Sequence, residues 1–150
     1  MEYSIPAVVI ATVLSVGFHL FALRVLWKVD LRWRTSARDL KIATLVLGCI
    51  LAHLIEISFF TVGIFTTASL DGDTNLALEA YSDRHRLDLW YYSASFYTSL
   101  GADRPPSPGL RLFAAFEAVV GLILITWTAS FLFLIMQDQW VRTRPASSGK

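Results

Sequence analysis

Four ionisable residues lie inside apolar stretches of this chain, and they are the first candidates for chemistry: His19, His53, Glu56 and Glu117. A titratable side chain is costly to bury in a membrane, so such residues mark functional sites or bonded partners. Glu56 follows His53 by three residues, which places both on one face of a helix. Glu117 either faces an axis shared by several copies of the chain, as an acidic ring, or points to a neighbouring helix near Tyr92, Ser93 or Tyr97, and the second orientation is favoured.

His19 and His53 are expected at similar depth. His19 lies eight residues before the end of the first apolar stretch and His53 eleven residues after the start of the second. In antiparallel helices this puts them within about 5 Å of one level. Two histidines at one level can ligate haem b from both sides, or each can hydrogen-bond within the bundle. A haem pocket needs small residues on both helices, and beyond Gly17 they are lacking, so hydrogen bonding is favoured.

Three apolar stretches are long enough to carry these residues across a membrane. The chain has 150 residues, 55% hydrophobic and 17% charged, whereas soluble domains carry about 25% charged residues. A span needs about 20 apolar residues, which predicts transmembrane helices over Ser4 to Trp27, Ile42 to Leu70 and Leu110 to Met136. We therefore expect an all-α integral membrane protein. A net charge of +1 without a basic soluble face argues against a nucleic-acid partner.

The distribution of charge predicts the orientation. Basic residues are concentrated between the first two spans and after the third, where the positive-inside rule places the cytoplasm: Lys28, Arg32, Arg34, Arg38, Lys41, Arg142, Arg144 and Lys150. The loop from Asp71 to Gly109 is mainly acidic and is expected outside. The N-terminus is then outside and the C-terminus inside, and the expected location is a plasma membrane of the bacterial inner-membrane type.

A short aromatic segment, "LDLWYYSASFYTS" from Leu87 to Ser99, lies between the second and third spans. As a helix it is about 20 Å long, too short for a hydrocarbon core of about 30 Å. One interpretation is a flat interfacial helix with Trp90, Tyr91 and Tyr92 as aromatic belt residues. The other is a re-entrant helix that returns through "LGADRPP", with its backbone buried in protein or lining a water-filled cavity.

Span two, the short helix, "YTSLGAD", a turn and span three together resemble the pore domain of tetrameric potassium channels. The resemblance implies a pore domain at residues 42–137, with an outer helix, a pore helix, a filter and an inner helix. Residues 1–41 then form an extra transmembrane helix with a cytoplasmic basic linker, and residues 138–150 a cytoplasmic tail. The resemblance also implies a homotetramer embedded in lipid that passes K⁺, Na⁺ or both and uses no cofactor.

The resemblance assigns six residues to the ion-binding filter: Thr98, Ser99, Leu100, Gly101, Ala102 and Asp103. The family's filter reads T-V-G-Y-G-D, so here one glycine remains and the tyrosine is lost. Potassium filters aim rings of carbonyl oxygens at one axis through glycines in left-handed conformations, which Leu and Ala adopt poorly. We expect fewer carbonyl rings and weak discrimination between K⁺ and Na⁺.

The resemblance also assigns supporting residues. Trp90 and Tyr91 lie where pore helices carry aromatic residues that brace the filter, Glu117 is expected to support the filter from the inner helix, and Gly121 lies where many members have a hinge glycine. No nucleophile elbow, Cys/His metal cluster or P-loop is visible, so neither an enzyme nor a metal site is expected. A passive cation channel is the predicted function; a non-conducting pore-fold subunit and a bis-histidine haem b anchor remain as alternatives.

Overall fold

The computed structural model describes residues 3–32, 38–70, 83–102 and 107–142, and in these ranges it is helical without any strand. The helices are α1 (Ser4–Arg32), α2 (Arg38–Leu70), α4 (Asp83–Tyr97) and α5 (Pro108–Arg142). α1, α2 and α5 are long and apolar enough to cross a membrane. The expectation of an all-α protein with three such helices is confirmed.

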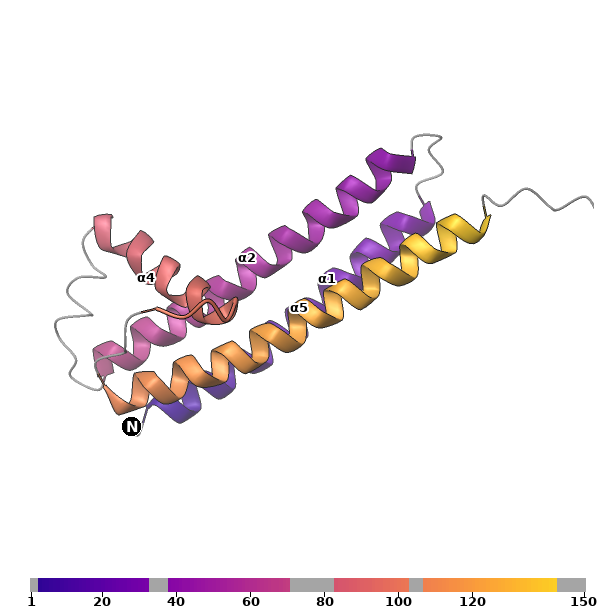
Figure 1. Cartoon of the computed structure of the whole chain (residues 1–150). Coiled ribbons are helices and arrows are strands. Elements are labelled where there is room, and N and C mark those ends of the chain that lie inside the picture. Colours follow the sequence, from indigo (N-terminus) through magenta and orange to yellow (C-terminus); the bar gives the residue numbers. More distant parts are fainter. Residues whose placement is uncertain (1–2, 33–37, 71–82, 103–106, 143–150) are drawn as a thin grey trace, which may run out of the picture.

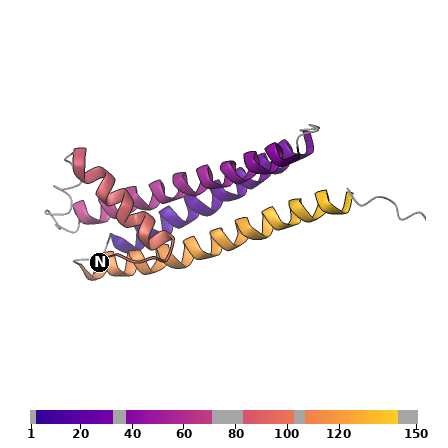
Figure 2. The ribbon, with the colours of Figure 1, turned by 45° about the horizontal axis from the view of Figure 1, so that its top comes forward.

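The three long helices lie alongside one another, and the short α4 lies obliquely at one end (Figures 1 and 2). α1 and α5 start at the same end and run in one direction, while α2 runs in the opposite direction. α1 packs against α2 and α5, and α4 packs against α2 and α5. The extra first helix is therefore in direct contact with both helices of the expected pore domain.

One apolar core joins all four helices. It contains residues from α1, α2, α4 and α5: Val8, Ala11, Ile57, Phe60, Ile64, Ala68, Leu89, Tyr97, Leu110, Phe113, Val120 and Leu124. Outside this core, large apolar side chains such as Val13, Phe21, Leu51 and Leu122 are each more than half exposed in the single chain. Contiguous exposed apolar surface of this kind is typical of helices that face lipid or another subunit.

The helices extend beyond the apolar stretches that predicted them. α1 continues to Arg32, α2 begins at Arg38, and α5 runs through Arg142, so the expected tail at 138–150 begins as helix; residues 143–150 lie outside the described part. Arg and Lys are good helix formers, and their long side chains reach water from helix ends. The short helix also differs from the expected Leu87 to Ser99, because it begins at Asp83 and ends at Tyr97.

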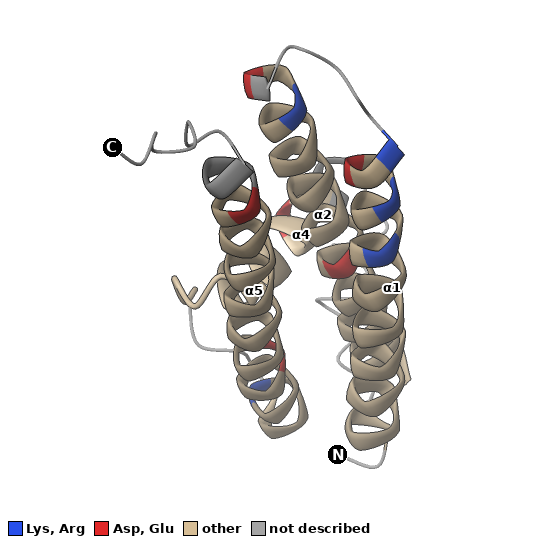
Figure 3. Cartoon of the chain, turned by 90° about the vertical axis from the view of Figure 1, so that its right-hand side faces the viewer, with Lys and Arg blue, Asp and Glu red and all other residues tan. Residues whose placement is uncertain are grey.

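Charged residues gather at one end of the bundle, where α1 ends and α2 begins (Figure 3). There Lys41 at the start of α2 forms an ion pair of 2.8 Å with Asp30 near the end of α1. Away from this end, the described part of the chain holds two buried carboxylates, those of Glu56 on α2 and Glu117 near the start of α5. These two buried residues, and the helix α4 that lies against both, define the region with potential function.

Candidate functional site

α4 is held at its position by polar side chains on both neighbouring helices. On the α2 side, Trp90 Nε1 donates to Ser58 Oγ at 3.3 Å. On the α5 side, Ser93 Oγ donates to Glu117 Oε1 at 2.5 Å. The same Ser93 oxygen lies 3.2 Å from the carbonyl oxygen of Ile57 on α2. Of the two orientations considered for Glu117, the structure has the one toward the short helix.

The end of α4 rests directly on α5 at Gly121. A Cβ atom at this buried glycine would collide with the backbone carbonyl group of Tyr97. The absence of a side chain therefore allows the last residue of α4 to touch the α5 backbone. Gly121 is thus a close-packing position within the continuous helix α5, whereas the sequence suggested it as a hinge; a hinge motion stays a prediction.

Glu56 is the centre of a buried polar cluster. Its Oε1 lies 2.8 Å from His19 Nδ1, and its Oε2 lies 2.9 Å from His53 Nδ1 and 2.5 Å from the phenol oxygen of Tyr97. The Glu56 and Tyr97 side chains are fully buried, and His19 is 1% exposed. An ionised carboxylate only accepts hydrogen bonds, so both imidazoles and the phenol donate to it through their N–H and O–H groups.

His53 extends this cluster to α5. Its Nε2 lies 3.0 Å from Thr128 Oγ1, and its Nδ1 also lies 3.0 Å from the Tyr97 phenol oxygen. With the proton on Nδ1, the Nε2 atom accepts a hydrogen bond from the threonine hydroxyl. We name His19, His53, Glu56, Tyr97 and Thr128 the Glu56 cluster. It contains side chains from α1, α2, α4 and α5, so it connects all four described helices.

The two histidines are as close as helix spacing predicted, with ring centroids 5.5 Å apart. Both rings direct Nδ1 at Glu56, which is the hydrogen-bonded arrangement. A porphyrin ligated by both would have to pass between two rings that share one carboxylate, and the indole of Trp127 already packs on His19 with centroids 5.5 Å apart. The geometry thus favours hydrogen bonding over haem ligation.

The same residues form a potential metal-binding group that the sequence did not predict. The ligand atoms of His19, His53 and Glu56 all lie within 4.8 Å of one another. Imidazole nitrogen and carboxylate oxygen are ligands of Zn²⁺. In the structure, however, the nitrogen atoms that face the carboxylate already hydrogen-bond to it, so a metal ion would have to replace these bonds.

A tight turn follows α4 and reverses the chain. The amide of Ser99 donates to the Phe96 carbonyl at 2.9 Å, and the amide of Gly101 donates to the Ser95 carbonyl at 3.0 Å. Ser99 has a φ of 60° and Gly101 a φ of 79°, both in the left-handed region. Within the turn, the described residues after Ser99 already head back toward the end of the bundle where α5 begins (Figure 1). Ser99 therefore takes a backbone conformation that glycine adopts far more readily than serine.

The six residues predicted as a filter are only partly described. Thr98, Ser99, Leu100, Gly101 and Ala102 form the turn, and all five are exposed in the single chain. Asp103 lies outside the described residues. Leu100 has an exposed fraction of 84%, so the described part of the chain leaves most of its side chain uncovered.

The predicted supporting residues occupy different environments. Trp90 packs against α2 and Glu117 bonds to α4, whereas Tyr91 is 69% exposed and faces away from the bundle. The sequence missed Tyr97 as a partner of Glu56, and Thr128 as a partner of His53. Both contacts could have been predicted only from polar residues that lie at the same depth on neighbouring helices. That comparison requires the relative positions of the helices along their axes to be known.

Comparison with known proteins finds no matching family model, no matching curated protein and no matching solved structure. The proposals that follow therefore depend on the geometry of the chain and on the resemblance of its residues 42–137.

Proposed function

We propose that four copies of this chain assemble into a passive channel for monovalent cations. In this assembly α2 is the outer helix, α4 the pore helix, the turn after it the filter, and α5 the inner helix. The observation that carries the proposal is the combination of a short helix with a chain reversal at its inner end. α4 has 15 residues and a length of about 22 Å, less than a hydrocarbon core of about 30 Å.

The exposed turn supports an oligomer. Thr98 to Ala102 are exposed in the single chain, yet they lie beyond the inner end of a helix that is packed between two apolar helices. Irregular backbone at membrane depth is tolerated only when it is buried in protein or lines a water-filled cavity. A ring of four copies around a central axis supplies both conditions, because each turn then faces water on one side and neighbouring subunits on the other.

The electrostatics of α4 favour a cation at the turn. The carbonyl end of a helix carries a partial negative charge, and α4 ends at Tyr97, directly before the turn. Four such ends around an axis attract a cation into the membrane interior. In the proposed assembly Asp103 forms an acidic ring at the outer mouth, which concentrates cations further.

The turn chemistry supports weak selectivity. Among Thr98 to Asp103 only Gly101 lacks a side chain, and the left-handed angle at position 99 falls on a serine. Fewer residues can then point successive carbonyls at one axis, so the filter offers fewer coordination rings than a complete potassium filter. Bonds from α4 to Glu56, Glu117 and Ser58 support this filter from behind, in place of the tyrosine that it lacks.

The proposal is tested by the reversal potential of the purified protein in a planar bilayer, with K⁺ on one side and Na⁺ on the other. We expect a cation current that reverses near zero. Asp103→Asn should lower the conductance because it removes the acidic ring, and Ser99→Ala should alter the K⁺ to Na⁺ permeability ratio. Thr66→Ala is the control, because that exposed hydroxyl bonds only to the Val62 carbonyl of its own helix.

A non-conducting pore-fold subunit is the second candidate, and one observation favours it. Leu100 is 84% exposed at the tip of the turn, and four leucine side chains around an axis would form a hydrophobic constriction, which can exclude water and ions. Absence of current from a protein shown to be tetrameric by native mass spectrometry would favour this candidate. Recovery of current in Leu100→Gly would then identify the leucine ring as the block.

A further inference from the structure

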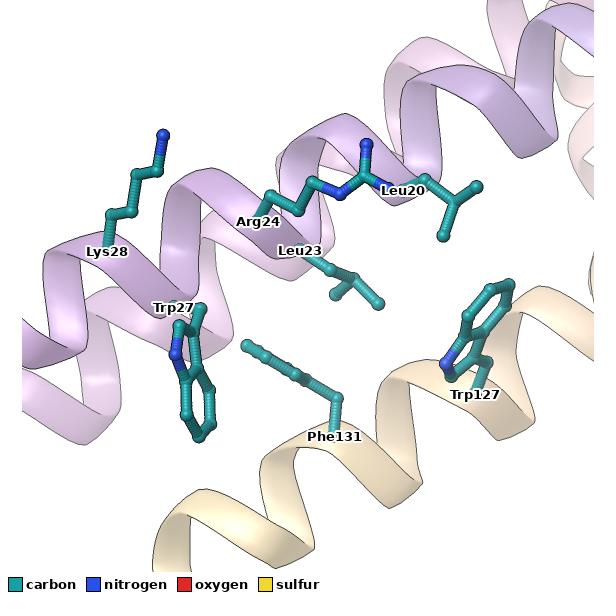
Figure 4. Close-up of a pocket in the computed structure, with 7 residues that line it drawn as sticks. All are labelled: Leu20, Leu23, Arg24, Trp27, Lys28, Trp127 and Phe131. Carbon is teal, nitrogen blue, oxygen red and sulfur yellow. The ribbon is translucent and has the colours of Figure 1, made fainter.

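An open groove of about 330 Å³ lies between α1 and α5, toward the end of the bundle where the basic residues gather (Figure 4). Its lining is almost wholly apolar and includes three aromatic rings. The apolar lining residues are Leu20, Leu23, Trp27, Trp127 and Phe131. The rings of Trp27 and Phe131 pack on each other with centroids 6.4 Å apart and an angle of 56° between their planes, so together they form one part of its wall. An open apolar groove of this volume can hold part of one hydrocarbon chain.

Two basic residues form one edge of the groove. Arg24 and Lys28 are one helical turn apart on α1, and both are exposed. Their stems line the groove, while their charged ends turn away from its floor (Figure 4). Neither makes an ion pair or hydrogen bond with any residue in the described part of the chain. Lys41 at the same end of the bundle, in contrast, is paired with Asp30.

The position of Arg24 favours contact with an external anion. It lies eight residues before the end of α1 at Arg32, about 12 Å along the helix. An unpaired guanidinium at that depth is costly unless it reaches the headgroup layer or meets an anion there. A lipid phosphate between Arg24 and Lys28 would supply an anion for both side chains. Arg binds phosphate through a planar pair of N–H donors, and Lys acts as a point charge.

We propose that this groove binds one anionic phospholipid of the surrounding leaflet. Its phosphate lies between Arg24 and Lys28, and one acyl chain follows the groove past Trp27 and Phe131 toward Trp127. Charge complementarity identifies the occupant, because basic pockets between transmembrane helices bind anionic headgroups. The inference does not depend on conduction and would hold for a non-conducting subunit.

The headgroup, not the acyl chain, must determine the preference. Acyl chains surround the helices everywhere, so moving one chain from bulk lipid into the groove changes little apolar exposure. Each basic side chain near the headgroups favours an anionic lipid about five-fold. We therefore expect a preference of roughly 30-fold for anionic over zwitterionic lipid with both residues present.

The test uses tryptophan quenching by brominated phospholipids in the full-length protein, reconstituted in vesicles of zwitterionic phosphatidylcholine. Trp27 and Trp127 line the groove, so a lipid bound there quenches their fluorescence. Brominated phosphatidylglycerol should reach a given degree of quenching at a mole fraction roughly 30-fold lower than brominated phosphatidylcholine requires for the same degree of quenching. Trp127→Phe should remove part of this high-affinity quenching and so assign it to the groove.

Charge variants decide whether the site is specific. Arg24→Gln with Lys28→Gln should remove the preference, while Arg32→Gln, which removes one charge from the same helix beyond the groove, should retain it. Equal quenching by both lipids in the wild type would overturn the proposal. So would a loss of the preference for anionic lipid in Arg32→Gln as large as the loss in the Arg24→Gln, Lys28→Gln double variant. Lack of quenching of the groove tryptophans by either lipid would overturn it too, because a second protein copy would then cover the groove. An unchanged circular dichroism spectrum establishes that the variants are folded.

Discussion

The phenol oxygen of Tyr97 lies 2.5 Å from Glu56 Oε2, so the last residue of the short helix α4 donates a hydrogen bond to a carboxylate in the middle of α2. The same carboxylate accepts a hydrogen bond from His19 on α1. One side chain thus connects the turn after α4 to the first helix. A displacement of α1 at this level would remove a partner of Glu56, the residue to which Tyr97 donates.

Tyr97→Phe tests this bond with the smallest possible change. The ring stays in the core and only the hydroxyl is lost, so Glu56 retains its two histidine partners. We expect a loss of about 1.5–3 kcal/mol in stability, as for a hydrogen bond to a charged group, measured by thermal unfolding in detergent. Tyr91→Phe is the matched control on the same helix, because Tyr91 is 69% exposed. Equal effects of the two variants would contradict the role of the bond.

Gly121→Ala should displace the end of α4 from α5. The added methyl group would overlap the backbone carbonyl of Tyr97, and a backbone atom cannot move aside as a flexible side chain can. Overpacking of this kind costs about 1–3 kcal/mol or more, read as a lower unfolding temperature. Gly17→Ala is the control, since a Cβ there meets nothing within 4 Å; it should leave stability equal or slightly higher.

The bond between Ser93 and Glu117 predicts a coupling energy. Ser93→Ala leaves Glu117 Oε1 without its donor, and Oε2 has no partner in the described part of the chain. A double-mutant cycle with Glu117→Leu, which removes the acceptor, should give a coupling of about 0.5–1.5 kcal/mol, the range of an ordinary side-chain hydrogen bond. Ser95→Ala serves as the control, because its hydroxyl bonds only to the Tyr91 carbonyl. A coupling near zero would mean that the two groups act independently.

Two substitutions in the turn should act in opposite directions. Gly101 has a φ of 79° and nothing within 4 Å of its missing side chain, so Gly101→Ala introduces backbone strain without a clash and should cost about 1–2 kcal/mol. Ser99 is already in the left-handed region, so Ser99→Gly relieves strain, offset by a more flexible unfolded chain. Its unfolding temperature should be unchanged or higher. A marked loss in Ser99→Gly would contradict the left-handed conformation.

The long helices could be predicted from the sequence because each depends on a local property. Runs of apolar residues from Ser4, Ile42 and Leu110 are sufficient to indicate helices that cross a membrane, and helix rise alone placed His19 and His53 at one level. The helix ends were less accurate. Charged residues such as Arg32 and Asp83 continue a helix as readily as they end it, so a hydropathy boundary is not a helix boundary.

The partners within the bundle could not be predicted, because they depend on the rotation of each helix about its own axis. Glu117 had three candidate partners on the short helix, and only the packing of α4 on α5 selects Ser93. Tyr97 was considered for Glu117 but bonds to Glu56. Ser99 shows another limit, since a serine in the left-handed region has no signature in a single sequence.

The Glu56 cluster also bears on how the chain enters the membrane. Helices are inserted in chain order, and α2 on its own would carry the carboxylate of Glu56 into lipid without a partner from another helix, at considerable cost. α1 precedes it and offers His19, which lies 2.8 Å from that carboxylate. We therefore expect the first helix to act as an insertion partner for the second, with the bonds of Tyr97 to Glu56 and of Thr128 to His53 forming once α4 and α5 are in place.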